Sequence, residues 1–486
     1  MQSFDTGDRG QQVAEHGKVR PMPSTADAAL LPLSIISPDD LPRPAISERD
    51  LGTLALLRAL RTNGLATYSA RTYTETRVHR RLLGRDFFWL SDLDDIDHVL
   101  NRHMDRYRRD PLGRRILEPT VGRGVLLAEG AEWRRQRQSL ASAFQPRYVD
   151  RLIPGFHDEA TRRIARWNAE GVRSRNLLVD FRALTLAIAA RAMFSIEDDR
   201  RTAQLADLMN EGERQKSFLH WRDFLFLLLG RGVAQPSVRR AFGERWRGWM
   251  ISFLEDRPPL AQLDEARDLL DLLRTARDQS SGGPFQAEAI VDQVGTMMVA
   301  GFETTAIALF WIALLLAFFP NQQEAIRGEL CAQSVDAPPE AQFLRSLPTT
   351  TAFVYETLRL YPPIYNLSRQ AAVDDRIGDL SIRRGATISI SPWVLHRHQR
   401  HWDRPHRFDP RRFVRDGRIA VPKAWMPFGA GPRICIGMAF ATTEIFTVLR
   451  ILLAHYRIAL QGQAPQPVGR VALLPAFEPS FKLLRL

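Results

Sequence analysis

A short stretch near the carboxyl end constrains this chain more than any other feature. Residues 427–437 read Pro-Phe-Gly-Ala-Gly-Pro-Arg-Ile-Cys-Ile-Gly, and residues 438–456 follow with an amphipathic pattern that predicts a long helix. Glycines before a lone cysteine allow a tight turn, because glycine adopts backbone conformations that a Cβ forbids. The turn therefore delivers Cys435 to a helix N-terminus, where unpaired N–H groups and the helix dipole favour a thiolate over a thiol.

A sulfur anion presented in this way suits a haem iron as its axial ligand. Arg433, two residues before the cysteine, is placed to reach an anionic group beside the metal, such as a haem propionate. A single cysteine in an intracellular protein is usually a small buried hydrophobe. Against that, the spacing Phe-x-x-Gly-x-Arg-x-Cys-x-Gly has an expected chance count on the order of 10⁻⁴ in a chain of this composition.

The segment from Phe428 to Gly437 resembles the haem-binding loop of the cytochromes P450, the haem-thiolate monooxygenases, at each defining position. The resemblance implies haem b as the cofactor and Cys435 as the proximal iron ligand. It also implies haem contacts from Phe428, Arg433 and Gly437. The fold it implies is mainly α, a large helical domain with a small β-rich region, and the haem lies between a long central helix and the cysteine loop.

Composition limits the possible partners and compartment. The chain has 486 residues, 45 % of them hydrophobic, and only two cysteines, which indicates a reducing compartment. Its formal net charge of +12 comes mostly from scattered arginines, which we interpret as solvated helix surfaces first and as a partner-binding face second. No interleaving of basic and aromatic residues suggests a nucleic-acid partner.

The amino-terminal region shows no targeting signal. Residues 1–20 are polar, and the apolar residues 28–36 are too few to span a bilayer and are interrupted by Pro32. We therefore expect a cytoplasmic monomer without a membrane anchor. Residues 1–45 are expected to form a flexible tail, and residues 46–486 a single haem domain.

A coarse pass along the chain places the remaining elements. The pattern predicts a strand pair within residues 72–88, an irregular segment over 106–124, amphipathic helices over 147–280, a loop over 276–284, a strand edge over 364–367, and a terminal hairpin over 471–486. The resemblance makes several of these regions walls of a substrate pocket. The residues expected there are Leu112, Val125, Leu126, Phe302, Ile364, Tyr365, Leu367 and Phe477, with residues 218–229 forming either a cover over the pocket or a core helix.

Trp133 and Arg137 lie four residues apart and so share one face of a helix. An indole N–H and a guanidinium on one face suit a carboxylate, although such a pair is more often a surface cation–π contact. The resemblance favours the carboxylate of a haem propionate. By family position it adds Arg369 as a further propionate partner.

Residues 285–319 predict one very long apolar helix that ends at Pro320. We favour a helix buried in a large protein over a membrane span, because the uninterrupted apolar run is shorter than the ~20 residues a span needs. Residues 300–305 read Ala-Gly-Phe-Glu-Thr-Thr, and a mid-helix glycine costs about 1 kcal/mol relative to alanine. A kinked core helix would explain this. The resemblance instead implies oxygen activation, with Ala300 and Gly301 beside the haem and Glu303 and Thr304 as an acid–alcohol pair.

Two further groups of residues are expected to be structural. Glu356 and Arg359 lie three apart on a helix over about 349–360 and can pair. The resemblance implies that Arg412 completes this pair and that the three side chains lock the haem-binding core. His396, His398 and His401 form a cluster, which we interpret as structural or surface residues rather than a metal site.

The function implied by the resemblance is monooxygenation of a hydrophobic organic substrate, such as a fatty acid or terpenoid. One atom of O₂ is inserted and the other leaves as water. No flavin-binding segment follows the haem region, so electrons are expected from a separate ferredoxin or flavodoxin with its reductase. Two alternatives stay open: a peroxide-using enzyme, isomerase or dehydratase on the same fold, and a non-enzymatic haem protein that binds a ligand.

Overall fold

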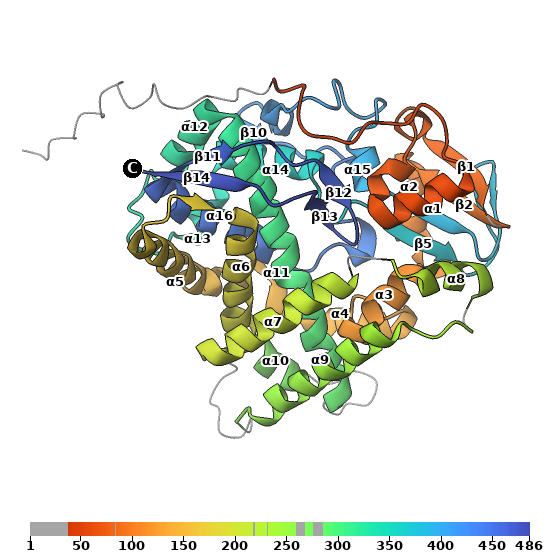
Figure 1. Cartoon of the computed structure of the whole chain (residues 1–486), viewed down its shortest axis with the longest axis horizontal. Helices are drawn as coiled ribbons and strands as arrows, with labels where there is room; N and C mark the ends of the chain where they lie inside the picture. Colours follow the sequence, from red (N-terminus) through yellow and green to blue (C-terminus); the bar gives the residue numbers. More distant parts are fainter. Residues whose placement is uncertain (1–36, 83, 217–218, 231, 259–267, 276–284) are drawn as a thin grey trace, which may run out of the picture. The chain divides into compact units, whose positions relative to one another are not determined.

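The computed structural model describes residues 37–82, 84–216, 219–230, 232–258, 268–275 and 285–486 (Figure 1). The predicted loop over 276–284, Phe218 and most of the predicted tail lie outside these residues. The last part of that tail, residues 37–45, is described and is not loose. Leu41 is 5 % exposed, and the Tyr361 hydroxyl donates to the Pro42 carbonyl at 2.9 Å. The predicted tail boundary at residue 45 is therefore too late, because an apolar side chain in this segment is buried.

Helices make up most of the described chain. The α-helices are α1 Thr53–Thr62, α2 Leu93–Asp97, α3 Pro111–Val121, α4 Gly130–Ala141, α5 Pro146–Glu170, α6 Leu177–Phe194, α7 Asp199–Lys216, α8 Trp221–Leu229, α9 Ser237–Glu255, α10 Leu269–Thr275, α11 Ala287–Phe318, α12 Pro320–Leu330, α13 Ala341–Arg345, α14 Pro348–Leu360, α15 Pro392–Leu395 and α16 Met438–His455. A π-helix, His98–Arg102, continues α2. A short 3₁₀ turn, η9 (Gly431–Arg433), precedes Cys435.

The strands form small sheets at one end and one side of this helical body. Their bounds are β1 Arg77–Leu82, β2 Arg85–Leu90, β3 Tyr107–Arg109, β4 Ser174–Arg175, β5 Leu367–Ala371, β6 Asp375–Ile377, β7 Leu380–Ile382, β8 Thr387–Ile390, β9 Val414–Arg415, β10 Arg418–Ile419, β11 Tyr456–Gln461, β12 Pro467–Gly469, β13 Leu473–Pro475 and β14 Ser480–Arg485. Within the described residues the largest sheet has five strands in the order β1-β2-β8-β5-β3. The predicted mainly helical fold with a small β-rich region is confirmed.

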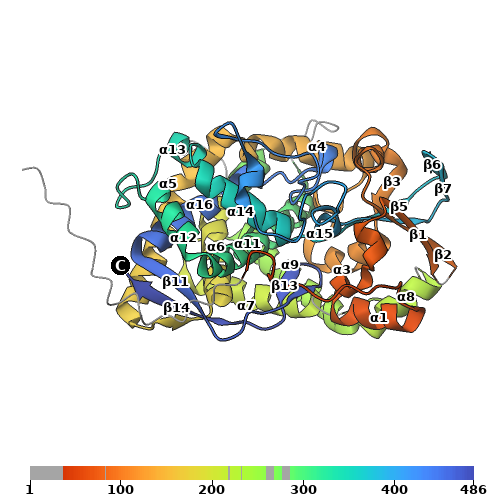
Figure 2. The ribbon, with the colours of Figure 1, turned by 90° about the horizontal axis from the view of Figure 1, so that it is seen from above.

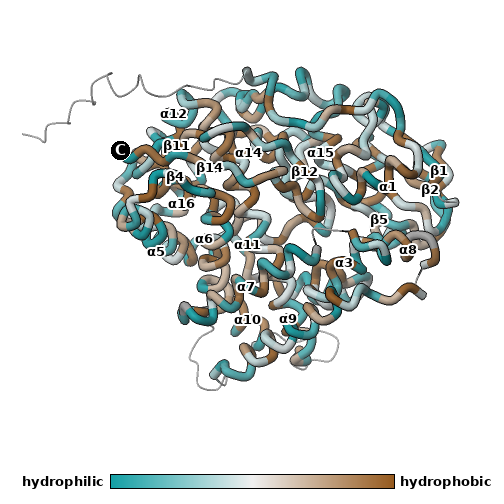
Figure 3. Tube along the Cα trace, viewed as in Figure 1, coloured by the Kyte–Doolittle hydropathy of each residue, from teal (hydrophilic) through white to brown (hydrophobic). Residues whose placement is uncertain are grey.

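Helix α11 runs through the interior, as the sequence predicts, and ends two residues before Pro320 (Figure 1). It is apolar on nearly every side, a pattern that requires burial on every side. Figure 2 shows α4 and α5 on the opposite side of α11 from α7 and α8. In Figure 3 polar segments such as α12 lie toward the periphery.

Two helices of the described chain, α11 and α16, are long and apolar enough to cross a membrane. Their most apolar windows are 83 % and 61 % buried inside the protein, respectively. The core helices of a protein can have this length and hydropathy too. Because most of α11 is buried inside the protein, the prediction of a buried central helix is confirmed over the described residues.

Three local predictions are wrong. Residues 106–124 are not irregular: they contain β3 and α3, because Asp110 caps the helix by accepting from the Gly113 N–H at 2.9 Å and Pro111 fills its first position. Residues 364–366 precede β5 rather than forming a strand with Leu367. The carboxyl-terminal strands β13 and β14 do not pair as a hairpin, since β13 pairs with β12 and β14 with β11 and β4.

The predicted lock around Glu356 is assembled. The Glu356 carboxylate accepts from Arg359 Nε at 2.6 Å and Nη2 at 2.8 Å, and Arg412 Nε lies 3.4 Å away. Arg359 also donates to the carbonyls of His396, Pro405 and Arg407. All five guanidinium N–H donors are thus used in a site with no solvent exposure. This network joins α14 to the segment that leads into the cysteine loop.

The histidine cluster is structural, as expected. His396 is fully buried; its Nε2 accepts from the Met426 N–H at 2.9 Å, and its Nδ1 lies 2.9 Å from the Arg359 carbonyl. Burial, with repulsion from Arg359, holds the pKa of His396 well below its usual value, so the ring stays neutral. Within the described ranges no cluster of three or more metal-binding side chains occurs.

We predict that Arg359→Ala destabilises the protein by about 3–5 kcal/mol, because it leaves Glu356 charged and buried without its main partner. The free energy of unfolding from urea titration measures this. Arg411→Ala is the matched control, since Arg411 is 84 % exposed and, among the described residues, forms an ion pair only with Asp409. Equal losses in the two variants would contradict the prediction.

Candidate functional site

The loop before α16 holds Cys435 as the sequence predicts. The Cys435 N–H donates to the Phe428 carbonyl at 2.9 Å, which closes the turn, and Gly437 is the N-cap of α16. Gly431 has a φ of +68°, and a Cβ there would overlap the carbonyl oxygen of Leu100. Glycine is required at this position both for its conformation and for the close approach of the π-helix.

The thiol of Cys435 is reached by solvent although protein surrounds it on its other sides. This partial burial raises the pKa of Cys435, while the Gly437 N–H and the charge of Arg137 lower it. The raising effect is the larger one. A metal cation bound beside the sulfur would favour the thiolate.

The glycine-containing segment of α11 presents a solvent-accessible side within an otherwise buried helix. Ala300 is exposed and Gly301 and Thr304 are partly exposed. The Thr304 hydroxyl donates to the Ala300 carbonyl at 2.8 Å, and the Thr305 hydroxyl to the Gly301 carbonyl at 3.2 Å. Both bonds have the pattern expected from the sequence for a locally loosened helix.

Glu303 is 4 % exposed and is held by an arginine that sequence reasoning did not identify. Arg182 of α6 donates to it from Nη2 at 2.7 Å and from Nε at 3.1 Å to each oxygen. A second carboxylate, that of Glu478, lies 3.4 Å from Arg182 Nη1. Glu303 therefore belongs to an ion-pair network that extends toward the turn between β13 and β14.

Three arginines gather where β3 meets β5. Arg109 lies directly opposite Arg369 in the antiparallel register, and Arg433 lowers the pKa of both by charge repulsion. For Arg369, burial and this repulsion together lower the pKa to about 10. Glu129 opposes the repulsion by accepting from Arg433 Nη2 at 2.6 Å and from the Arg109 N–H at 2.7 Å.

The three arginines fit an anionic group with several acceptor oxygens. Like charges on directly opposed strand residues are destabilising without such a group. Within the described residues, Arg109 Nε and Arg433 Nη1 are buried without a hydrogen-bond partner, and buried donors of this kind ordinarily have one. The paired carboxylates of a haem would supply those acceptors.

The two other predicted haem contacts lie on α4. Trp133 is 6 % exposed, and the Arg433 guanidinium stacks over its ring at 4.5 Å from the ring centroid. Arg137 lies close enough to Cys435 to lower the pKa of the thiol. The structure thus brings Trp133 to the arginine cluster and Arg137 to the sulfur. The propionate role of both residues stays a prediction.

The expected pocket residues differ in how far they are exposed to solvent. Leu112, Leu126, Ile364 and Leu367 are partly exposed, Val125 is 8 % exposed and Phe477 is 48 % exposed. Phe302 does not share the accessible side of α11: it lies about 200° around the helix from Ala300 and packs into the core at 3 % exposure.

Tyr365 is likewise packed into the fold. A Cβ on either Gly64 or Gly469 would overlap the Tyr365 ring or hydroxyl, so this ring fills the space that the two glycines leave. Phe302 therefore does not line the accessible side of α11, whereas a pocket role for Tyr365 stays a prediction. The other expected wall residues stay predictions.

Helix α16 carries an acidic residue that the sequence analysis did not single out. Glu444 is fully buried, and neither of its carboxyl oxygens has a hydrogen-bond partner within the described residues. Burial raises the pKa of Glu444 well above its usual value, and the nearby Thr305 hydroxyl lowers it only in part. Glu444 is therefore expected to keep its proton to a higher pH than an exposed carboxyl group does.

The sequence analysis does not single out four residues that the structure makes notable: Arg109, Glu129, Arg182 and Glu444. Each is a common charged residue whose partners lie far away in the chain. Of these four, only Glu444 could have been noticed in the sequence, because it is a lone carboxylate among the apolar residues of the predicted helix over 438–456.

Comparison with known proteins agrees with this geometry. The sequence model of the cytochrome P450 family matches residues 65–480. Cytochrome P450 132 of Mycobacterium tuberculosis is 32 % identical over 395 residues, which cover 78 % of this chain and 84 % of that protein. Pentalenene oxygenase of Streptomyces avermitilis is 32 % identical over 373 residues, which cover 75 % of this chain and 80 % of that protein.

Solved structures share the fold. A cyanobacterial CYP120A1 with bound retinoic acid superposes with a TM-score of 0.73 at 23 % identity, over 92 % of this chain and 100 % of that one. CYP102L1, another cytochrome P450, gives a TM-score of 0.74 at 19 % identity, over 92 % of this chain and 99 % of that one.

The chain therefore belongs to the cytochrome P450 family. It is a monooxygenase of the oxidoreductase class, with haem b as its cofactor. Haem b fits both the solvent-accessible Cys435 and the cluster of Arg109, Arg369 and Arg433, whose positive charge Glu129 balances only in part.

We predict that Glu444→Gln stabilises the protein increasingly as pH rises. The folded wild type keeps a proton on Glu444 that the unfolded chain releases above about its usual pKa of 4.5. Wild-type stability consequently falls with rising pH by about 1.4 kcal/mol per unit from this group.

Urea unfolding of both proteins at about pH 5 and about pH 8 measures the difference. The advantage of the variant should be larger at the higher pH, since other groups cancel in the comparison. An advantage that is constant or shrinks with rising pH would show that Glu444 is ionised in the fold.

Proposed function

We propose that this protein hydroxylates a hydrophobic organic substrate with one oxygen atom from O₂. The proposal rests on one combination of features: Cys435 on its glycine turn, the nearby cluster of Arg109, Arg369 and Arg433, and the Glu303–Thr304 segment of α11. Bound haem supplies the activation of O₂.

The chain's own residues have distinct roles in this proposal. Cys435 is the iron ligand, and Arg369 and Arg433, joined by Arg109, hold the haem carboxylates. Glu303 and the Thr304 hydroxyl would hold protons and pass them along α11 on the side that would face the haem. Arg182 supports this role because it orients the Glu303 carboxylate. It also contacts Glu478, an exposed residue, so only one side chain separates Glu303 from the protein surface.

The substrate is proposed to be a fatty acid, a terpenoid or a similar apolar molecule. The partly exposed aliphatic candidates Leu112, Leu126, Ile364 and Leu367 support an apolar pocket. A relative named pentalenene oxygenase also supports a hydrocarbon-like substrate.

A peroxide-using enzyme, isomerase or dehydratase on the same fold is the second candidate. It needs no electron donor, whereas the proposed hydroxylation needs both reduced donor and O₂. The intact Glu303–Thr304 pair favours hydroxylation, because delivering protons to reduced oxygen requires such a pair. A protein that only binds a haem ligand would show binding without product.

The remaining parts of the proposal concern partners and organisation. Electrons are proposed to come from a separate ferredoxin or flavodoxin with its reductase. The scattered surface arginines support an acidic partner, since complementary charge speeds association. A cytoplasmic monomer without a membrane anchor, in which residues 46–486 form one haem domain together with the segment from residue 37, completes the proposal.

We predict that Cys435→Ala abolishes the thiolate-type Soret band of the ferrous carbonyl adduct. Cys331→Ala should retain that band, because the pKa of Cys331 is raised by burial and its neighbours offer no metal site. An unchanged spectrum in Cys435→Ala, or a wild-type spectrum like that of imidazole-ligated globins, would overturn the assignment of the ligand.

We further predict that Glu303→Gln lowers the rate of product formation by about 10² at saturating substrate, because a positioned acid–base group contributes on that scale. The ferrous carbonyl spectrum should not change. Glu288→Gln, an exposed position in the first turn of the same helix, is the control. A normal rate in Glu303→Gln would remove Glu303 from the proton path.

A further inference from the structure

Three consecutive carbonyls of α11 each lie within hydrogen-bond distance of a threonine hydroxyl. Two of these hydroxyls, those of Thr304 and Thr305, belong to α11 itself and donate to the carbonyls four residues earlier. The third belongs to α6: Thr185 Oγ1 lies 3.0 Å from the Phe302 carbonyl oxygen. Residues 300–306 nevertheless stay α-helical. Hydroxyl bonds therefore loosen this segment without breaking it, and one of them comes from another helix.

The contact from Thr185 belongs to a face of α6 that addresses two adjacent residues of α11. Thr185 follows Arg182 by three residues, so both side chains lie on that face. Arg182 binds the Glu303 carboxylate, and Thr185 reaches the carbonyl of the residue before it. Helix α6 lies beside α11 in both Figure 1 and Figure 2. One face of α6 thus contacts both the side chain of Glu303 and the backbone next to it.

The Thr185 hydroxyl also has an acceptor on its own helix. Its Oγ1 lies 2.9 Å from the Phe181 carbonyl oxygen, and a hydroxyl has one proton to donate. Donation to Phe181 is the ordinary bond of a helical threonine and holds nothing outside α6. Donation to Phe302 joins two helices and fixes the direction of a carbonyl within the Ala-Gly-Phe-Glu-Thr-Thr segment.

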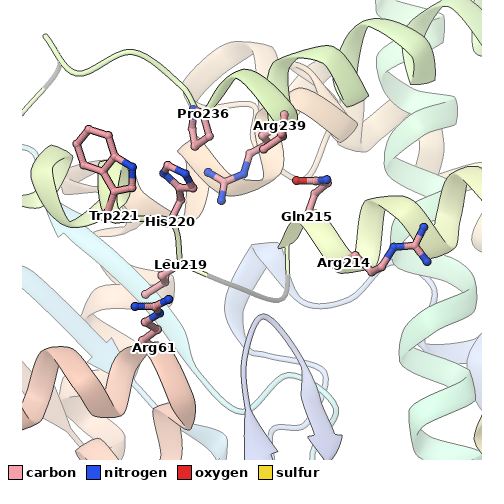
Figure 4. A pocket seen from close by; sticks show the side chains of 9 residues that line it. Arg61, Arg214, Gln215, Leu219, His220, Trp221, Pro236 and Arg239 are labelled. Carbon is pink, nitrogen blue, oxygen red and sulfur yellow. The ribbon is translucent and has the colours of Figure 1, made fainter.

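Water does not reach the place where Thr185 meets α11. Thr185 has no solvent exposure, and Phe302 is 3 % exposed. The recess in Figure 4, with a volume of about 390 Å³, is lined by described residues of α1, α7, α8, α9 and the segment just before α8, and none of these lies on α6 or α11. A water molecule therefore cannot replace the hydroxyl at this contact.

We propose that Thr185 is a positioning residue, whose hydroxyl donates to the Phe302 carbonyl and so fixes the orientation of the Glu303–Thr304 segment. A hydrogen bond between groups that are removed from water orients both partners strongly. This inference rests on the proposed function, because the contact matters for catalysis only if Glu303 and Thr304 handle protons.

Hydrogen–deuterium exchange of the haem-loaded protein, followed on peptides that cover residues 300–306, tests the contact. Amides in a buried helix exchange through local opening, and an opening that separates α11 from α6 must break the bond to Thr185. Thr185→Val keeps the shape of the side chain and removes the hydroxyl. Exchange of these amides should be about three- to tenfold faster in this variant, the change that losing one buried hydrogen bond produces. Thr185→Ser should restore most of the protection.

The matched control is Thr357→Val on α14. Thr357 is fully buried like Thr185, and its hydroxyl donates to the Phe353 carbonyl of its own helix at 2.8 Å. Exchange over residues 300–306 should not change in this control. Unchanged or slower exchange in Thr185→Val would overturn the proposal, and so would equal acceleration in the control. If Thr185→Val does not bind haem, Thr185→Ala takes its place in the comparison.

The C–O stretching band of the ferrous carbonyl adduct gives a second measurement, because it responds to polar groups that face the bound carbon monoxide. Thr185→Val should broaden or split this band, since the Thr304 hydroxyl then takes more than one orientation. Thr185→Ser should retain the wild-type band. An unchanged band together with faster exchange would show that Thr185 only holds the two helices together, and it would overturn the positioning role.

Neither measurement needs a substrate or an electron donor, so the proposed function is judged separately. Faster exchange and a changed band in a protein that forms no hydroxylated product would support the role of Thr185 and overturn the proposed hydroxylation. Normal exchange in Thr185→Val of a protein that does hydroxylate its substrate would overturn the role of Thr185 alone.

Discussion

Repulsion among cations is the interaction on which the centre of this protein depends. The register of β3 and β5 sets Arg109 against Arg369, and the cysteine loop adds Arg433. Glu129 alone does not balance three positive charges. The fold thus contains a cationic site that is favourable only with an anion present, and a group that binds the folded state but not the unfolded chain stabilises the fold by mass action. Haem b is in this sense a structural component as well as the reactive one.

The sequence was informative where function depends on a local conformation. The turn at Gly431, the helix that begins at Met438 and the end of α11 before Pro320 all follow from short-range rules about glycine, proline and capping. The lock of Glu356 and Arg359 was also accessible, because residues three apart share a helix face and the family's order supplied Arg412.

The sequence was uninformative where function depends on strand register or on helix packing. Arg109 becomes a site residue only through its pairing with Arg369, a residue far along the chain. Arg182 becomes one only because α6 packs against α11. The segment over 106–124 shows a different failure: it is predicted to be irregular, although Asp110 followed by Pro111 is a strong helix start. Local chemistry permitted both conformations, and packing selected the helix.

The placement of Arg182 between Glu303 and Glu478 has a consequence for how this enzyme can vary. Glu478 is exposed at the surface turn between β13 and β14, whereas Glu303 is buried in the central helix. Removing the charge at position 478 alters how strongly Arg182 is drawn away from Glu303. A substitution at the protein surface can therefore change the electrostatic surroundings of a carboxylate that lies in the core.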